Sequence, residues 1–329
     1  MRAVQLGLDL SDPRTLARVR ETALPKAVQG VFVPPIKSQG IKTKLIPFIF
    51  ESIRWDGCGR WVEPFLGSGV VLFNLAPPRA YVADANLHVI QFYRDLSSGQ
   101  VDENVVRDYL ECEGRTLAER GDEYYYEVRH RFNARPNSLD FLFLNRSCFN
   151  GIIRFNRRGE FNVPFVRKAD RFRRALVTKI ANQVAEARRL MRDREWVFEV
   201  ADWRDTLSQV RSDDFVYADP PYIGRHTDYF NKWTEHDALS LLSWLRSLPC
   251  GFALSTWKEN KYRRNAHLDL AMSDVVIKTT KHFYHVGATE ALRNEMVEAL
   301  VIKEGFASVQ TRTSAQHDDR AHTRPHPRH

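Results

Sequence analysis

The 329-residue sequence lacks the features of several common protein classes. It has only four cysteines, Cys58, Cys112, Cys148 and Cys250, with no CxxC pair and no Cys/His cluster. This argues against both a disulfide framework and a zinc site, so we expect reduced thiols and no metal. No apolar run approaches the roughly 18 to 20 residues needed to cross a bilayer, and the N-terminal region has no uninterrupted apolar signal core. We therefore expect a cytoplasmic protein with no membrane partner.

The composition that remains is that of a globular protein with an uneven charge distribution. Hydrophobic residues make up 43% and charged residues 27% of the chain, and the net charge is +8. A basic chain suggests a polyanionic partner, although net charge alone is weak evidence. The segment 145–174 carries nine basic and two acidic residues, so almost the whole excess lies in one short stretch.

The order of apolar patterns indicates an α/β fold. Short apolar runs predict strands, longer periodic runs predict helices, and their alternation favours a mostly parallel sheet covered on both faces. A Thr-x-x-Asp spacing marks the start of the last helix. The predicted strands are 60–65, 80–83, 196–200, 215–218, 251–255, 275–279 and 298–302, and the predicted helices are 43–53, 87–96 and 234–248.

The chain divides into two parts by pattern. Residues 96–195 are mainly helical in pattern and rich in Arg, Glu, Tyr and Asn, without strand runs, which is typical of an insertion. It interrupts a domain formed by residues 31–95 and 196–308. We expect a peripheral extension at residues 1–30 and disorder at residues 309–329, where the histidines favour a solvated tail over a metal site.

The first chemical motif is the loop Glu63-Pro64-Phe65-Leu66-Gly67-Ser68-Gly69, which follows a predicted strand. Glycines there let the backbone approach a ligand, and the following helix offers free N–H groups. Asp84 ends the next strand and can accept the hydroxyl protons of a ribose. The simpler interpretation is a β–α turn, and a nicotinamide dinucleotide would fit equally well, so the pair indicates only a nucleoside pocket.

The second motif, Asp219-Pro220-Pro221-Tyr222, follows the strand 215–218. Two prolines fix the backbone and remove N–H donors, which leaves the Asp219 carboxylate and main-chain carbonyls as a rigid row of acceptors. An exocyclic amino group supplies matching donors, and Tyr222 offers a face for a ring. The alternative is a turn that merely ends a strand. The motif predicts an amine held against a methyl donor.

These motifs resemble those of the amino-methyltransferases that act on DNA, which carry FxGxG after one strand and D/N/S-P-P-Y/F/W after a later one. The strongest match lies in the insertion, where Leu144-Asn145-Arg146-Ser147-Cys148-Phe149-Asn150-Gly151 leads through Arg154 and Asn156 to Gly159-Glu160-Phe161-Asn162-Val163-Pro164-Phe165. This is similar to the LNRxxFNGxxRxNxxGxFNVPFG run of the Dam-like DNA adenine-N6 methyltransferases. An aromatic flanked by Arg and Asn can wedge between bases, while guanidinium groups pair with phosphates or guanine edges.

The resemblance implies a Rossmann-like seven-stranded mixed sheet whose last strand is antiparallel, with a helical target-recognition insertion. It implies S-adenosyl-L-methionine as cofactor and double-stranded DNA as substrate. The segment 37–45 resembles the family's N-terminal K-W-A-G-G-K-x-x-L element, with Ser38 in place of the aromatic. Asp202 resembles the residue that accepts a hydrogen bond from the amino group of the cofactor adenine, and Trp203 resembles the residue that covers the adenine ring. The simpler interpretation is a helix cap and a packing residue.

The implied site has three groups of residues. The catalytic residues are Asp219, Pro220, Pro221 and Tyr222. The cofactor residues are Lys37, Gly40, Lys42, Glu63, Pro64, Phe65, Gly67, Gly69, Asp84, Asn86, Asp202, Trp203 and Asp219. The DNA-binding residues are Arg146, Phe149, Asn150, Arg154, Asn156, Arg157, Asn162, Pro164 and Arg167.

Other activities remain open at this stage. The same chemistry could act on cytosine N4, RNA adenine or a glutamine side chain, and a non-catalytic DNA-binding protein could retain a degenerate methyltransferase fold. We expect a site-specific DNA adenine methyltransferase of a restriction-modification or epigenetic context, for which a cognate restriction endonuclease would be the functional partner. We expect a monomer or weak dimer. A short palindrome such as GATC is one candidate recognition sequence.

Overall fold

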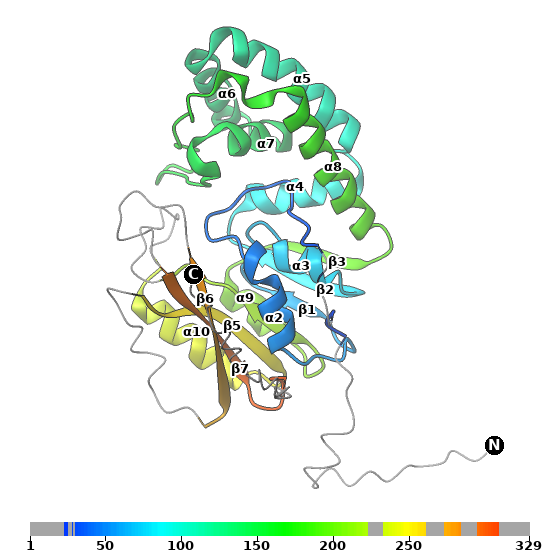
Figure 1. Cartoon of the computed structure of the whole chain (residues 1–329), viewed down its shortest axis with the longest axis vertical. Helices are drawn as coiled ribbons and strands as arrows, with labels where there is room; N and C mark the ends of the chain where they lie inside the picture. Colours follow the sequence, from blue (N-terminus) through cyan, green and yellow to red (C-terminus); the bar gives the residue numbers. More distant parts are fainter. Residues whose placement is uncertain are drawn as a thin grey trace, which may run out of the picture.

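The computed structural model describes residues 23–25, 28, 30–222, 233–260, 273–283 and 295–308. The expected disorder at 309–329 and most of the expected extension at 1–30 lie outside these residues. The described chain forms a twisted sheet with helices on both faces, and a group of helices at one end of the molecule (Figure 1).

Seven strands form one sheet in the order β3-β2-β1-β4-β5-β7-β6. Strands β1 to β5 pair in parallel, whereas β7 runs antiparallel to both β5 and β6. The predicted seven-stranded mixed sheet with an antiparallel last strand is therefore confirmed. The strands are β1 (Trp61–Glu63), β2 (Arg79–Asp84), β3 (Glu195–Val200), β4 (Phe215–Ala218), β5 (Gly251–Asn260), β6 (Val275–Phe283) and β7 (Glu295–Lys303).

Alternating residues of the central strands enter two separate cores. Trp61 and Phe215 belong to the larger core, and their rings stack at 5.3 Å between centroids. Their neighbours Val62 and Val216 belong to the second core on the other face. Because successive side chains of a strand point to opposite faces, both faces of the sheet are covered.

Helices of the sheet domain follow the predicted positions with local differences. The expected helix 43–53 opens as a 3-10 turn, η1 (Thr43–Leu45), before α2 (Ile46–Ser52), because Pro47 favours the first positions of an α-helix. The predicted Thr234–Asp237 capping box is confirmed at the start of α10. The remaining helices of this part are α3 (Val70–Leu75), α4 (Leu87–Ser98), α9 (Trp203–Ser208) and α10 (Glu235–Ser247).

Strands β5, β6 and β7 are longer than the apolar runs that predicted them. The antiparallel pairing of β7 with both neighbours continues past the buried part of the sheet, as in the pairs of Lys281 with Val297 and of Glu259 with Val297. Backbone hydrogen bonds between antiparallel neighbours do not require apolar side chains, so the polar ends of these strands carry no alternation to predict.

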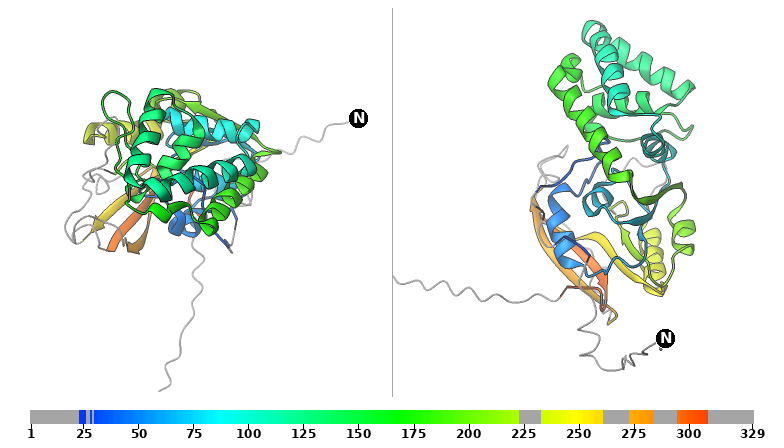
Figure 2. Two further views of the ribbon diagram at one scale, coloured as in Figure 1. Left: turned by 90° about the horizontal axis from the view of Figure 1, so that it is seen from above. Right: turned by 90° about the vertical axis from the view of Figure 1, so that its right-hand side faces the viewer.

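The segment predicted as an insertion forms a helical group beside the sheet, which Figure 2 shows from above and from the side. Its main helices are α5 (Glu103–Arg120), α6 (Asp122–Ala134), α7 (Ser138–Ser147) and α8 (Arg174–Met191), with short 3-10 turns η2 (Phe149–Gly151) and η3 (Ala169–Phe172). Helix α4 packs on both α7 and α8, so it joins this group to the sheet.

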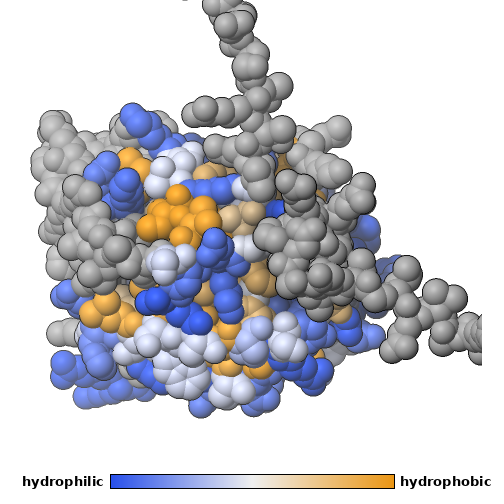
Figure 3. Space-filling view, turned by 90° about the horizontal axis from the view of Figure 1, so that it is seen from below, coloured by the Kyte–Doolittle hydropathy of each residue, from blue (hydrophilic) through white to orange (hydrophobic). Residues whose placement is uncertain are grey.

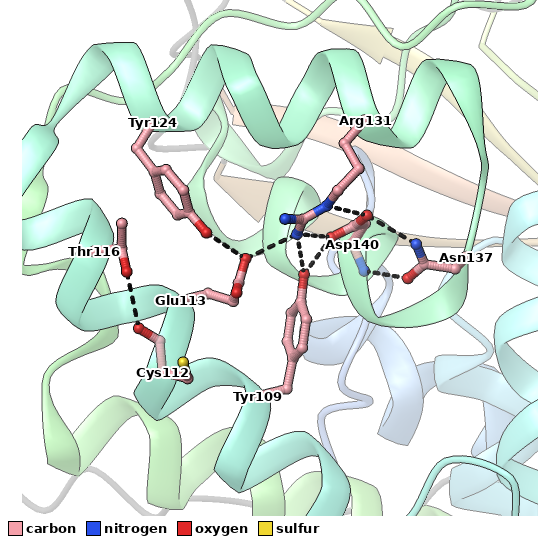
Figure 4. Close-up of polar contacts among 8 residues, drawn as sticks. All are labelled: Tyr109, Cys112, Glu113, Thr116, Tyr124, Arg131, Asn137 and Asp140. Atoms are coloured by element: carbon pink, nitrogen blue, oxygen red, sulfur yellow. Dashed lines mark hydrogen bonds and ion pairs between the residues drawn. The ribbon is translucent and has the colours of Figure 1, made fainter.

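A polar network holds α5, α6 and α7 together (Figure 4). The buried Asp140 accepts hydrogen bonds from Arg131 Nε at 3.0 Å and from the Tyr109 hydroxyl. Arg131 also donates to Glu113 at 2.8 Å, and Tyr124 donates to the same carboxylate at 2.7 Å. Because a buried carboxylate is costly without such partners, this network fixes the three helices that precede most of the expected recognition segment, residues 145–174.

The outer surface offers few apolar regions. On the described part of the face seen from below, hydrophobic side chains form small groups separated by hydrophilic ones (Figure 3). Among the described residues, no helix has the length and apolar content to span a membrane. All four cysteines are free thiols, with Cys148 and Cys250 buried.

Candidate functional site

The glycine loop leaves β1 and enters α3 with a left-handed backbone. Gly67 and Gly69 have φ of 51° and 71°. A Cβ on Gly69 would lie 2.9 Å from the Phe73 ring, whereas a Cβ on Gly67 would meet only Ser38 Oγ at 3.9 Å. Open space beside Gly67 is what a ligand that approaches the backbone requires.

Asp84 anchors this loop from the end of β2. Its Oδ2 accepts the Gly67 amide at 2.8 Å, and its Oδ1 accepts the Asn86 amide at 2.8 Å. Burial raises the pKa of Asp84, and these two hydrogen bonds partly oppose the shift. Asn86 itself caps α4 by accepting the amides of His88 and Val89. Each Asp84 oxygen keeps a lone pair for a hydroxyl ligand.

Glu63 lies buried at the end of β1, directly before the loop. Its Oε1 accepts the Trp61 Nε1 proton at 2.7 Å. Burial, with a smaller contribution from the nearby Asp219, raises the pKa of Glu63 to about 8. Glu63 is therefore mainly a neutral acid at neutral pH. Pro64 is buried after it, while the half-buried Phe65 meets Trp233 edge to face at 5.5 Å.

Asp202 and Trp203 follow β3, whose end lies beside the end of β2. Asp202 caps α9 by accepting the Arg204 amide at 2.9 Å. Trp203 is buried and packs at 6.3 Å from Trp233. These contacts are those of a cap and a packing residue, so the cofactor roles of both residues stay proposals.

The Asp-Pro-Pro-Tyr motif extends from β4, next to β1 in the sheet. Tyr222 is 9% exposed, clusters with Trp257 and donates from its hydroxyl to Glu298 Oε2 at 2.6 Å. Asp219 Oδ1 is buried and lies 2.9 Å from the Lys42 ammonium. Burial raises the pKa of Asp219. The motif thus places a buried carboxylate, paired with a lysine, close to a fixed aromatic ring.

The N-terminal element 37–42 runs along the whole site. Lys37 exchanges two backbone hydrogen bonds with the Asn145 side chain, at 2.8 and 2.9 Å, so it lies against the recognition segment. Burial and the charge of Arg146 lower the pKa of Lys37 to about 8. Gly40 has φ of 72°. At the other end, the Lys42 ammonium lies 2.9 Å from Asp219 Oδ1.

The recognition segment presents Phe149 at the tip of a braced loop. The Phe149 amide donates to the Pro164 carbonyl at 2.8 Å. The backbones of Cys148 and Phe165 pair in an isolated antiparallel β-bridge. The Phe149 side chain is 49% exposed. Asn150 is also exposed and has φ of 55°. A large apolar ring held outward on a rigid loop is suited to wedging into a base stack.

A small hairpin supports the neighbouring polar residues. Arg154 Nε donates to Asn162 Oδ1 at 2.8 Å, and the Asn162 amide donates to the Arg154 carbonyl. The Asn156 side chain donates to Glu160 at 2.7 Å and accepts the Arg158 amide. Asn156 and Asn162 therefore shape the hairpin, and their expected DNA contacts stay proposals.

The structure corrects one expected DNA contact. Arg146 is only 3% exposed, and its guanidinium donates to the Pro35 carbonyl at 3.0 Å. Burial and the charge of Arg171 lower its pKa to about 10. Arg146 therefore joins α7 to the sheet domain instead of facing DNA. In contrast, Arg157 and Arg167 are exposed. The Arg167 side chain is 83% exposed, and its Nε lies 3.6 Å from Asp122 Oδ2.

Two side chains of the site, one buried and one half-buried, escaped the sequence analysis. Glu298, from β7, is 1% exposed and contacts Tyr222. A charged residue in an otherwise apolar strand run was the available signal. Trp233, which links Phe65 to Trp203, follows the Asp-Pro-Pro-Tyr motif without any distinguishing pattern.

This strand order, with a glycine loop after β1 and the Asp-Pro-Pro-Tyr motif after the neighbouring β4, is that of a methyltransferase fold. Residues 38–290 match the family described as D12 class N6 adenine-specific DNA methyltransferase, and the chain belongs to this family.

Curated relatives agree with this membership. The type II methyltransferase M.MjaIII of Methanocaldococcus jannaschii is 29% identical over 225 residues, which cover 62% of this chain and 74% of the relative. The DNA adenine methylase of Serratia marcescens is 34% identical over 197 residues, 57% of this chain and 66% of the relative. A solved rRNA methyltransferase, AviRa from Streptomyces viridochromogenes, shares 13% identity over 75% of this chain and 77% of its own, with a TM-score of 0.30, which is too low to inform the comparison.

Proposed function

We propose that the chain transfers the methyl group of S-adenosyl-L-methionine to N6 of an adenine flipped out of duplex DNA. The observation that carries this proposal is the parallel pairing of β1 with both β2 and β4. It brings the glycine loop, Asp84 and Asp219 to the same edge of the sheet, where open α/β sheets bind ligands.

The residues at this edge fit the cofactor. Open space beside Gly67 admits a ligand close to the backbone, and α3 begins directly after this loop. Asp84 would accept from the ribose hydroxyls, as a carboxylate in this position does in other nucleoside sites. Asp202 and the aromatic group of Phe65, Trp203 and Trp233 would hold the adenine of the cofactor. When bound, S-adenosyl-L-methionine supplies an electrophilic methyl group.

Asp219 would then activate the target amine. Its buried Oδ1 and the Pro220 carbonyl would accept the two N6 protons, which draws the nitrogen lone pair away from the purine ring and toward the methyl carbon. As the N–C bond would form, the bond between the cofactor sulfur and the methyl carbon would break and leave a neutral thioether. The methylated amine would then be acidic, and Asp219 could take its proton. Tyr222, fixed at its hydroxyl by Glu298, would stack on the flipped adenine.

The basic segment would bind the duplex. Phe149 would wedge into the stack beside the target base, and Asn150 and Pro164 lie on the same exposed loop. Arg157 and Arg167, both exposed, would contact phosphates or base edges. Arg154 is half-buried on the same hairpin. This arrangement supports duplex DNA over RNA as the substrate.

We place this activity in a restriction-modification or epigenetic setting, as a site-specific adenine methyltransferase that acts as a monomer or weak dimer. A cognate restriction endonuclease would be a functional partner only in the restriction-modification setting. Sequencing N6-methyladenine in plasmid DNA from cells that express the protein identifies the recognition sequence.

Transfer of tritiated methyl groups from S-adenosyl-L-methionine to duplex DNA tests the proposed function. The wild-type protein should label adenine in duplex DNA, and Asp219→Ala should abolish labelling while cofactor binding persists. Labelling of RNA or of cytosine in place of DNA adenine would contradict the substrate assignment. Methylation that survives Asp219→Ala would contradict the mechanism.

A further inference from the structure

Lys42 is a buried cation at the centre of the site. It is 3% exposed, although lysine seldom loses its water without a compensating partner. Its ammonium lies 2.9 Å from Asp219 Oδ1 and donates to the Gly40 carbonyl at 3.1 Å. It also lies 4.6 Å from the centre of the Tyr222 ring. Lys42 therefore contacts both side chains that would hold the target adenine.

The surroundings of Asp219 are otherwise acidic. Burial is the main cause that raises the pKa of Asp219, the charge of Glu298 adds to it, and Lys42 is the strongest opposing influence. Asp219 in turn raises the pKa of Glu63 and of Tyr217. The groups that face Asp219 are Glu63 from β1, Tyr217 from β4, Ser255 from β5, Glu298 from β7 and Lys42 from the segment before η1.

The chemistry of the amine requires an ionised Asp219. A carboxylate accepts at both oxygens, whereas a protonated carboxyl group donates at one of them and cannot take the proton that the methylated amine releases. A carboxyl group at this position would be held protonated by burial and by the charge of Glu298 unless a cation opposes them.

We propose that Lys42 is a positioning residue for methyl transfer, whose buried ammonium holds Asp219 ionised as the acceptor of the target amine. This role rests on the proposed function and goes beyond it, because it moves Lys42 from the cofactor pocket to the amine site. Lys42 acts through Asp219, and its contact with Tyr222 fixes the ring beside the same carboxylate.

Four variants test this role. Lys42→Met and Lys42→Gln remove the charge, and Lys42→Arg retains it. Lys44→Met is the matched control, because Lys44 is exposed two residues away and loses the same charge. The double variant Lys42→Met/Asp219→Asn lacks both charges, so it should fold even if Lys42→Met does not.

Stability against pH tests the pairing without any activity. A carboxyl group with a raised pKa loses stability as the pH rises through that value, and Lys42→Met should deepen this loss. We expect the unfolding midpoint of Lys42→Met to fall further below wild type at about pH 8 than at about pH 5. The difference between Asp219→Asn and the double variant should not vary with pH. An equal midpoint difference at both pH values for Lys42→Met overturns the proposal.

Methyl transfer to duplex DNA against pH tests the role in chemistry. The acid limb of kcat/KM should move upward by about one to three pH units in Lys42→Met and Lys42→Gln, as an opposite charge within a few ångströms predicts. Lys42→Arg and Lys44→Met should keep the wild-type limb. An acid limb that does not move in Lys42→Met overturns the proposal. A raised KM for S-adenosyl-L-methionine with an unchanged pH profile also overturns it, because that result indicates that Lys42 binds the cofactor. If wild type methylates no DNA, the proposed function fails, and the stability comparison still decides whether Lys42 keeps Asp219 ionised.

Discussion

Replacement of Glu63 by Gln should reverse a pH-dependent loss of stability. Glu63 is 2% exposed, and burial raises its pKa from 4.5 to about 8. The folded chain therefore keeps this proton over a pH range in which the unfolded chain releases it. The stabilising contribution of this proton is complete below the pKa that Glu63 has in the unfolded chain. It is lost as the pH rises through the pKa that Glu63 has in the folded chain.

The magnitude follows from these two values. A difference of one between the pKa of a group in the folded chain and its pKa in the unfolded chain corresponds to about 1.4 kcal/mol of free energy. Between about pH 4.5 and about pH 7, the wild type should lose about 3 kcal/mol of unfolding free energy through Glu63 alone. The glutamine variant is neutral in both states and escapes this loss, while its Oε1 can still accept the Trp61 proton.

Urea denaturation of both proteins at several pH values measures the effect. The stability of Glu63→Gln relative to wild type should rise steadily from about pH 5 to about pH 8, whatever constant cost the buried amide adds. Glu51→Gln, an exposed glutamate on α2, should show no such trend. A relative stability of Glu63→Gln that is flat with pH would refute the reasoning.

Three further predictions concern the polar network of α5, α6 and α7, the exposed Phe149 and the glycine loop. Asp140→Asn should lower the unfolding free energy by about 2 kcal/mol in denaturation experiments, because it removes the buried partner of the partly exposed Arg131; an unchanged stability would contradict the bracing role of that network. Phe149→Ala should reduce kcat/KM for duplex DNA at least about tenfold with less than about 0.5 kcal/mol change in stability, because the ring is 49% exposed; equal activity would exclude a wedge at this position. Gly67→Ala should weaken S-adenosyl-L-methionine binding in calorimetry and destabilise the fold by about 1 to 2 kcal/mol, because φ is 51° there; unaltered affinity would separate the loop from the cofactor.

The local sequence pattern determined most of the parallel sheet. β1 and β4 are short apolar runs buried on both faces, so their positions followed from composition alone. The Asp-Pro-Pro-Tyr motif and the glycine loop were likewise visible, because their chemistry depends on residues adjacent in the chain. The capping box of α10 belongs to the same class of local signal.

Tertiary packing decided which side chains meet at the site. Lys42 and Glu298 are far from Asp219 and Tyr222 in the sequence. The pairing of β4 and β7 on either side of β5 brings Glu298 to Tyr222, and the packing of the segment before η1 brings Lys42 to Asp219. Packing also turned Arg146 inward from a segment whose basic composition predicted exposure. Local pattern specifies backbone conformation and apolar faces, whereas burial and the pairing of charges depend on neighbours from other elements. The sequence by itself thus identified the methyltransferase motifs, and the folded chain determined which cation faces the acceptor carboxylate.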